Sequence, residues 1–329
     1  MTTNVEARAC CRIDLAGGTL DIWPIGLLHR GARTLNVAID VEVNVAMRRR
    51  ERGWAVVQEG ARIDVAVRGD LLKSPESALV GLVAEHFDLA AVEVAVRSAS
   101  PRGAGLGASS ALAVALIAAA ERLSGRARAA TADTVHLARD FEARLMGLPT
   151  GIQDHYPALL GGALEILHQP GGEQVRRLAV DLDELGRSLV LIYSGGSHLS
   201  AANNFEVVAR RLGGDAATTE RLASIAAVAE AMARRLDAGD LEGAGRLLTE
   251  EWRARRELAP VVSTPAVERV LEHGIAAGAW GGKVCGAGGG GCVVLLVPPA
   301  SREAIIDRIS ALGYEALRCR PSAGGLRVS

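Results

Sequence analysis

A glycine-rich loop that runs directly into an alanine-rich helix constrains the fold of this chain more than any other feature. The stretch from Pro101 to Leu123 reads PRGAGLGASSALAVALIAAAERL. Glycines let backbone N–H groups approach a ligand closely, and Ser109 and Ser110 stand where the N-cap of the following helix is expected. Because a helix N-terminus offers unpaired N–H donors and a partial positive charge, the stretch predicts an anion site, most naturally for phosphate.

The loop alone leaves a second interpretation open, which is an ordinary glycine-rich turn capped by serine. No Lys-Ser or Lys-Thr pair closes the loop, so it is not a Walker A sequence. The flanking pattern also lacks a clear strand–helix–strand unit, which weakens a dinucleotide-binding interpretation. Other motifs therefore have to decide what the loop binds.

The periodicity of apolar residues predicts a mixed α+β chain. Residues 36–47 alternate strictly between apolar and other residues, and this pattern is typical of a half-buried strand. Further strands are predicted at residues 63–67, 92–96, 163–167, 188–193 and 291–299. Helices are predicted over residues 72–87, 110–123, 131–146, 264–277 and 302–312, with several more between 200 and 257. A turn-rich stretch near 168–187 suggests two domains, which we place at residues 1–175 and 176–329.

Length, charge and cysteine content exclude several classes of protein. The 329 residues suffice for two domains, and 49% apolar residues provide a sizeable core. A formal net charge of −1 speaks against binding nucleic acid or anionic membranes through bulk charge. The five cysteines show no metal or disulfide spacing, and no signal-peptide or membrane-spanning pattern is present. We therefore expect a cytoplasmic monomer or homodimer without nucleic-acid or membrane partners.

Three further stretches decide between the interpretations of the loop. They are CRIDLAGGTLDIWP at 11–24, PTGIQDHYPALLGG at 149–162 and KVCGAGGGGCVVLL at 283–296. Together with the loop they resemble, in order and separation, the motifs of the galactokinase, homoserine kinase, mevalonate kinase and phosphomevalonate kinase superfamily, the GHMP kinases. The resemblance implies a two-domain α+β fold, with an N-terminal mixed α/β domain that carries the phosphate-binding loop and a ferredoxin-like C-terminal domain. It also implies a kinase that uses ATP and Mg²⁺ on a small molecule.

The resemblance assigns the phosphate loop and the metal ligands. The residues expected to wrap the ATP phosphates are Pro101, Gly103, Ala104, Gly105, Leu106, Gly107, Ala108, Ser109 and Ser110. Ser109 is expected to reach Mg²⁺, with Ser110 as the alternative because GASS aligns either way. Glu142 in DFEARLMGLPTG matches the second ligand, and Mg²⁺ prefers such oxygen ligands. The simpler interpretation of Glu142 is a solvated helix residue.

The resemblance also implies the catalytic pair. Asp154 in GIQDHY matches the aspartate that accepts the proton of the substrate hydroxyl in galactokinase-like members. Arg12 matches the basic residue beside it, where mevalonate kinases carry lysine. A permanent cation would keep Asp154 ionised and help to neutralise charge during phosphoryl transfer. Without the resemblance, a capping aspartate and a surface arginine would be the simpler interpretations.

Substrate contacts are expected around Asp21, which lies nine residues after Arg12 and matches the sugar-binding aspartate of galactokinases. The other expected substrate contacts are Gly17, Gly18, Thr19, Gly151, Ser197, Gly288 and Gly289. The glycine run 286–291 is expected to pack beside the phosphate loop, and we assign no role to Lys283. Further candidates for a sugar or its distal phosphate are His198, Ser200, Asn204, His29, Arg30 and Arg33.

The motifs most resemble those of bacterial D-glycero-D-manno-heptose 7-phosphate kinases and fucokinase-like sugar kinases. This implies transfer to an anomeric hydroxyl, with D-glycero-D-manno-heptose 7-phosphate as the first candidate substrate. Galactose itself is disfavoured, because the Glu-His ahead of the galactokinase aspartate is replaced here by Gly18-Thr19-Leu20. The alternatives are a fucokinase, galactokinase or uronate-type sugar 1-kinase, another metabolite kinase, and a non-catalytic sugar sensor. The presence of Asp154 speaks against the sensor.

Overall fold

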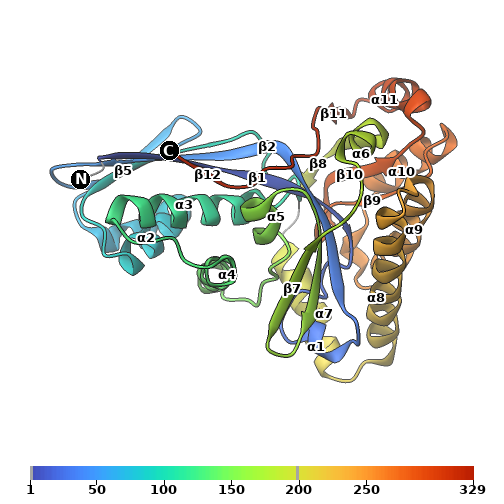
Figure 1. Ribbon diagram of the computed structural model, residues 1–329, viewed down its shortest axis with the longest axis horizontal. Helices are drawn as coiled ribbons and strands as arrows, with labels where there is room; N and C mark the ends of the chain where they lie inside the picture. Colours follow the sequence, from blue (N-terminus) through green and yellow to red (C-terminus); the bar gives the residue numbers. More distant parts are fainter. Residues whose placement is uncertain (1–2, 198–199) are drawn as a thin grey trace.

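The computed structural model describes residues 3–197 and 200–329, and it contains two β-sheets with helices packed against them (Figure 1). The larger sheet has the strand order β12-β1-β2-β5-β3-β4, and β6 and β7 extend it from β2. Its strands are β1 (Asn4–Ala16), β2 (Arg33–Arg49), β3 (Trp54–Gln58), β4 (Ala61–Val65), β5 (Val92–Ser98), β6 (Ala163–Gln169), β7 (Gly172–Arg177) and β12 (Arg327–Val328). The predicted strand over residues 36–47 is thus confirmed as the middle of the long strand β2.

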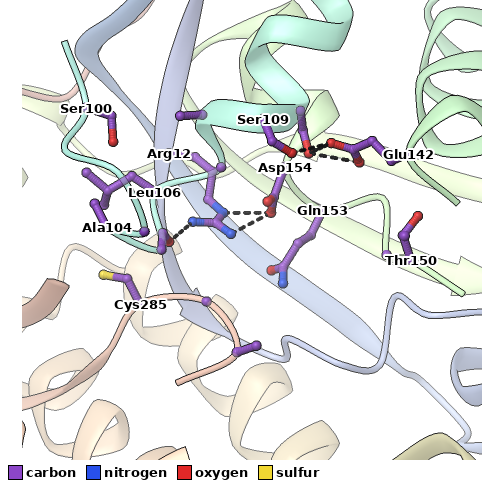
Figure 2. Close-up of a pocket in the computed structure, with 18 of the residues that line it drawn as sticks. Arg12, Ser100, Ala104, Leu106, Ser109, Glu142, Thr150, Gln153, Asp154 and Cys285 are labelled. Atoms are coloured by element: carbon purple, nitrogen blue, oxygen red, sulfur yellow. Dashed lines mark hydrogen bonds and ion pairs between the residues drawn. The ribbon is translucent and has the colours of Figure 1, made fainter. Parts of the chain in front are cut away.

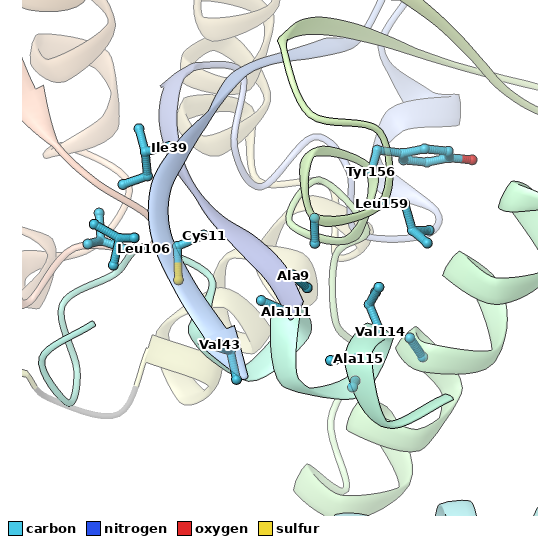
Figure 3. Close-up of a cluster of buried hydrophobic side chains, with 14 of the residues drawn as sticks. Ala9, Cys11, Ile39, Val43, Leu106, Ala111, Val114, Ala115, Tyr156 and Leu159 are labelled. Atoms are coloured by element: carbon cyan, nitrogen blue, oxygen red, sulfur yellow. The ribbon is translucent and has the colours of Figure 1, made fainter. Parts of the chain in front are cut away.

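Helices cover one face of this sheet, below it in the view of Figure 1. They are α2 (Pro75–His86), α3 (Ala108–Ser124), α4 (Thr131–Met146) and α5 (His155–Leu160), with the short α1 (Ile25–Leu28) and the 3-10 turn η1 (Arg68–Lys73) at its edges. Figure 3 shows Ala111 and Ala115 of α3 beside Ala9 of β1 and Val43 of β2, all within the main buried cluster. Small side chains on α3 let the helix lie close to the sheet. The loop that leads into α3 contacts β1, where the Arg12 amide donates to the Leu106 carbonyl oxygen.

The smaller sheet has the antiparallel order β11-β8-β10-β9. Its strands are β8 (Leu189–Ser197), β9 (Gly281–Val284), β10 (Gly290–Leu296) and β11 (Glu315–Leu317). The helix α10 (Pro265–Ala276) precedes β9, and α11 (Arg302–Ser310) joins β10 to β11. A β-α-β-β-α-β chain in this strand order is the ferredoxin-like arrangement. The predicted α+β fold with a ferredoxin-like C-terminal part is confirmed.

The remaining helices flank or interrupt this second unit. They are α6 (Leu182–Ser188), α7 (Ser200–Leu212), α8 (Ala216–Asp237) and α9 (Leu241–Arg255), with the 3-10 turns η2 (Pro260–Val262) and η3 (Pro299–Ser301). In Figure 1, α8 and α9 stand side by side along the outer edge of the C-terminal part. In the described part of the chain, no helix combines the length and apolar character that crossing a membrane requires.

The larger sheet takes in segments from both sides of the predicted domain boundary. The chain turns after Gln169, and β7 then pairs with β6 as far as Arg177. At the other end of the chain, β12 pairs with β1, and the Glu6 amide donates to the Ser329 carbonyl at 3.1 Å. The division at residues 175 and 176 therefore stays a prediction, and the last residues of the chain pack with the first unit.

Candidate active site

A cavity of about 440 Å³ lies where loops from both sheets meet (Figure 2). Every residue predicted for the phosphate loop lines it. The opposite walls come from the 149–154 segment, from the loop of residues 17–21 and from the glycine run that begins at Gly286. We call residues 17–21 the acceptor loop, because they include the predicted substrate contacts that follow β1. The structure therefore brings the four sequence motifs to one place.

The phosphate loop reaches helix α3 through a series of left-handed glycines. Gly103, Gly105 and Gly107 have φ values of 68°, 73° and 73°, which residues with a side chain rarely adopt. Gly107 is the N-cap of α3, and among the described residues no side chain caps the helix. The predicted cap at Ser109 or Ser110 is therefore wrong, because the left-handed Gly107 starts the helix earlier. The uncapped first turn leaves N–H donors for an anion.

The third glycine motif packs directly against the phosphate loop. A Cβ atom at Gly291 would lie 2.7 Å from the Gly103 carbonyl oxygen, and one at Gly105 would lie 2.6 Å from the Cys285 carbonyl oxygen. Only glycine fits at such backbone contacts. Cys285 itself is buried, and burial raises the pKa of its thiol to about 12, as suits a small apolar core residue.

The two predicted substrate contacts in this motif, Gly288 and Gly289, differ in whether they line the cavity. Gly288 lines the cavity. The amide of Gly289 donates instead to the carbonyl oxygen of Val262 at 2.8 Å, and Gly289 does not line the cavity.

Arg12 connects the predicted catalytic base to the phosphate loop. Figure 2 shows its guanidinium group directed at Asp154, with 2.8 Å from Nε and 2.6 Å from Nη2 to Oδ1. Its Nη1 donates to the carbonyl oxygen of Gly105, and its backbone amide donates to that of Leu106 at 2.9 Å. Burial alone would lower the pKa of Arg12, but the charges of Asp154 and Asp14 and the hydrogen bond to Asp154 together raise it. The guanidinium group of Arg12 therefore keeps its positive charge beside Asp154.

Asp154 lies against the start of helix α3. A Cβ atom at Gly107 would be 3.1 Å from Oδ2 of Asp154, so a side chain at this position would crowd the carboxylate. A hydroxyl held by Asp154 would consequently lie beside the helix N-terminus that can hold a phosphate.

Glu142 collects three hydrogen-bonding side chains around its buried carboxylate. The hydroxyls of Ser109 and Ser110 donate to Oε1 at 2.6 and 2.9 Å, and Nε2 of His155 lies 3.1 Å from Oε2. Burial alone would raise the pKa of Glu142, but the charge of His155 and these hydrogen bonds hold it below its usual value. The interpretation of Glu142 as a solvated helix residue is wrong, because α4 turns it into the protein.

These oxygen atoms form a donor set that fits Mg²⁺. Both serine hydroxyls reach Glu142, so the alternative between Ser109 and Ser110 stays open. The sequence reasoning did not select His155, whose only signal was its place next to Asp154 in GIQDHY.

Asp21 lines the cavity, but one of its two carboxylate oxygens is hydrogen-bonded to the protein backbone. Oδ2 accepts hydrogen bonds from the backbone amides of Ile152 and Gln153 at 2.8 and 3.0 Å. Oδ1 is buried and has no partner among the described residues. Burial raises the pKa of Asp21 to about 6; the amide of Gln153 opposes this shift, and the nearby charge of Asp154 adds to it.

The raised pKa of Asp21 gives a pH-dependent prediction. Between its usual value of 3.8 and about 6, the native state binds more protons at this site than the unfolded state, so stability falls as pH rises through this window. Asp21→Asn removes this loss, which totals about 3 kcal/mol. We expect the free energy of unfolding of the variant, relative to wild type, to increase by about 1 kcal/mol from pH 5 to pH 7.5 in urea titrations.

The control variant, Asp237→Asn, removes a carboxylate whose pKa is shifted in the opposite direction. Hydrogen bonds from Arg176 lower the pKa of Asp237. The contribution of Asp237 to stability is therefore fully present above its usual pKa of 3.8 and is lost only as pH falls below it, so the stability of Asp237→Asn relative to wild type should stay constant from pH 5 to pH 7.5. Parallel trends for the two variants would contradict the assignment to Asp21.

A fully buried cluster of charges lies behind the acceptor loop and was missed by the sequence reasoning. Nζ of Lys283 lies 2.9 Å from Oδ2 of Asp14 and 3.4 Å from Oε2 of Glu251. Arg255 binds Glu251 through Nε at 2.9 Å and donates from Nη2 to the carbonyl oxygen of Gly18 at 2.9 Å. Burial alone would raise the pKa of Asp14, but the charges of Lys283 and Arg255 lower it. The cluster joins β1 to β9 and α9.

The two glycines of the acceptor loop lie behind the cavity wall rather than in it. A Cβ atom at Gly17 would lie 1.9 Å from the Arg33 carbonyl oxygen, and Gly18 contacts Arg255 and Gln153. Their small size thus serves contacts within the protein. Of the predicted acceptor-loop contacts, Thr19 and Asp21 line the cavity, as does Gly151.

Most of the candidates for a distal phosphate whose side chains the structure describes lie outside the cavity. Three of them do not line the cavity: His29, Arg30 and Arg33. His29 accepts a hydrogen bond from an arginine of α7, and Arg33 pairs with a glutamate of β6. Asn204 does line the cavity. The side chains of Ser197 and Ser200, and all of His198, lie outside the described part of the structure.

This fold and this arrangement of loops are those of a GHMP kinase. The family of GHMP kinase N-terminal domains matches residues 75–162, and that of the C-terminal domains matches residues 227–315. The chain belongs to this family, so the predicted family and the prediction of a kinase are confirmed. Membership implies ATP as a substrate.

The individual relatives are mainly sugar kinases. The D-glycero-alpha-D-manno-heptose 7-phosphate kinase of Campylobacter jejuni is 25% identical over 330 residues, which cover 93% of each chain. The bifunctional fucokinase/GDP-fucose pyrophosphorylase of Arabidopsis thaliana is 26% identical over 91% of this chain, which spans 30% of that protein's length. The crystal structure of a D-glycero-D-manno-heptose 1-phosphate kinase from B. thetaiotaomicron has the same fold, with a TM-score of 0.80 at 22% identity and coverage of 99% and 98%.

Proposed function

We propose that the protein is a sugar kinase that transfers the γ-phosphate of ATP to a hydroxyl group, and that this hydroxyl is the anomeric one. The observation that carries the proposal is the position of Asp154, which is paired with Arg12 and lies against the N-cap glycine of α3. A base and a phosphate site are thereby adjacent, as in-line phosphoryl transfer requires. The relatives named as heptose and fucose kinases support a sugar as acceptor.

In this proposal Asp154 accepts the proton of the attacking hydroxyl. Arg12 holds the Asp154 carboxylate in place at the cavity, and its bond to Gly105 holds the phosphate loop at a fixed distance from the base. The first-turn amides of α3 bind phosphate oxygens. Because phosphoryl transfer depends mainly on position and charge neutralisation, these groups supply the protein's contacts to the acceptor hydroxyl and the phosphates.

Glu142 and one or both of the neighbouring serines would hold Mg²⁺, which neutralises phosphate charge when it is bound. His155 keeps the Glu142 carboxylate ionised and oriented. Both serine hydroxyls donate to Glu142. The serine that binds Mg²⁺ would direct a lone pair of its hydroxyl oxygen at the cation.

The two serines can be distinguished by mutation. We expect Ser109→Ala to raise the Mg²⁺ concentration for half-maximal activity about tenfold, because a metal contact is lost. Ser110→Ala is the matched variant, since it also removes a hydroxyl from Glu142. Titration of Mn²⁺ binding by electron paramagnetic resonance gives a second measurement without turnover. A shift only in Ser110→Ala would move the ligand by one residue, and no shift in either would contradict serine ligation.

Our first candidate substrate is D-glycero-D-manno-heptose 7-phosphate, supported by the relative of that name, which this chain matches over 93% of its length. The test is Mg²⁺-dependent ADP release with single acceptors: this heptose phosphate, free heptose, mannose, fucose, galactose, glucuronate and mevalonate. Turnover with a free sugar alone would support the proposed sugar kinase activity but contradict the heptose phosphate as its substrate. Turnover with mevalonate alone would replace the substrate class, and sugar binding without turnover would favour a sensor.

A further inference from the structure

Asp21 stands at the junction of two loops, and its two carboxylate oxygens have different surroundings. Oδ2 accepts the amides of Ile152 and Gln153, and Oδ1 has no partner among the described residues. The bonds that hold the side chain are therefore those to the backbone of the 151–153 segment.

This backbone leads directly to Asp154. Asp154 is the N-cap residue of α5, yet its side chain does not cap that helix. Its carboxylate turns to Arg12 instead. The helix therefore does not fix the Asp154 side chain, and the peptide groups 151–152 and 152–153, whose amides Asp21 holds, lie just before Asp154 in the chain.

Gly151 supplies an independent observation. A Cβ atom there would lie 1.8 Å from Oδ2 and 2.5 Å from Cγ of Asp21. The Gly151 backbone has no left-handed conformation that would itself demand glycine. The missing side chain is thus what allows the Asp21 carboxylate to reach the amides of Ile152 and Gln153.

The loop that carries Asp21 is itself anchored. Arg255 donates to the carbonyl oxygen of Gly18 at 2.9 Å and to the hydroxyl of Thr19 at 3.3 Å. Arg255 is in turn bound by Glu251 within the buried cluster. Asp21 is therefore an acceptor in a fixed position, as a positioning group must be.

We propose that Asp21 is a positioning residue, which holds the 151–153 backbone through Oδ2 so that Asp154 faces the acceptor hydroxyl. This role is separate from a sugar contact, which would use Oδ1. It rests on the proposed function insofar as Asp154 is the base. A shift of about 1 Å in a reacting group costs on the order of 10²-fold in rate, so the effect of Asp21 falls on kcat.

Three variants distinguish the role of Oδ2 of Asp21 from that of Oδ1. In Asp21→Asn the amide oxygen can still accept both backbone bonds, so we expect kcat within about threefold of wild type, with any lost sugar contact seen in KM. Asp21→Ala loses both bonds, and we expect kcat to fall about 10²-fold. Gly151→Ala displaces the carboxylate without changing it and should also lower kcat.

A double-mutant cycle joins these variants. If Gly151→Ala acts by displacing Asp21, then Asp21→Ala combined with Gly151→Ala is no slower than Asp21→Ala alone. The matched control is Asp181→Ala, because Asp181 also accepts two successive amides, those of Asp183 and Glu184 at 2.8 and 2.9 Å, but caps α6 outside the cavity. Its kcat should stay at the wild-type value.

Amide hydrogen exchange tests the proposal without turnover. The amides of Ile152 and Gln153 should exchange faster in Asp21→Ala and Gly151→Ala, but at the wild-type rate in Asp21→Asn and Asp181→Ala. Unchanged exchange in Asp21→Ala, a change in KM alone, or a kcat for Asp21→Asn as low as for Asp21→Ala would each overturn the proposal. If wild type turns over no sugar, the proposed function fails, and the exchange experiment still decides whether Asp21 holds the loop.

Discussion

Replacing Asp154 by asparagine is expected to lower kcat about 10³-fold and to leave ATP binding within about threefold of wild type. Asparagine has nearly the same shape and can still accept a hydrogen bond from Arg12, but it cannot take the proton of the attacking hydroxyl. Because asparagine fits the space of aspartate beside Gly107, the first-turn amides of α3 keep their geometry, and so does the loop that Arg12 holds at Gly105. The loss therefore falls on the chemical step.

Rapid-quench measurement of a single turnover, with ATP-analogue binding followed by calorimetry, separates these two effects. Asp237→Asn is the matched control, since Asp237 also receives two guanidinium nitrogens, at 3.1 and 2.7 Å from Arg176, and does not line the cavity. Its single-turnover rate should match wild type. Near-normal transfer by Asp154→Asn would remove Asp154 as the base, and a parallel loss of nucleotide binding would assign it to the ATP site.

The parts of the site that the sequence could predict are those whose signal is local. The phosphate loop needs glycines at the alternate positions 103, 105 and 107, and α4 has a clear helical pattern that ends at Met146, as predicted. Arg12 and Asp154 lie 142 positions apart in the chain, and only the resemblance to known kinases paired them before the structure did.

Other parts depend on contacts that no local pattern records. Strand β1 was not predicted because it is buried on both faces after Ala9, so it does not alternate, and Arg12 and Asp14 interrupt its apolar run. Asp14 and Lys283 are 269 residues apart, and nothing near either one indicates the other. Burial of both charges becomes understandable only once β1 and β9 face each other.

Replacing Lys283 by methionine is expected to lower the free energy of unfolding by about 3–5 kcal/mol. Methionine fills much of the space of the lysine stem, so the loss is mainly electrostatic. The carboxylates of Asp14 and Glu251 would stay fully buried, and Glu251 would keep only Arg255. Lys73, the other lysine of the chain, is exposed on η1 beside Asp70, so Lys73→Met is a matched control with little expected change.

The loss of stability in Lys283→Met should depend on the Asp14 carboxylate that remains buried without its partner. Asp14→Asn combined with Lys283→Met removes both members of the closest pair, so we expect it to be more stable than Lys283→Met by about 1–3 kcal/mol in urea titrations. Additive losses would show that the two side chains act independently and would contradict the cluster. Because Arg255 of this cluster also holds Gly18, Lys283→Met should in addition raise the KM for the acceptor more than that for ATP. Equal changes in both would mean that the cluster stabilises the fold without positioning the acceptor loop.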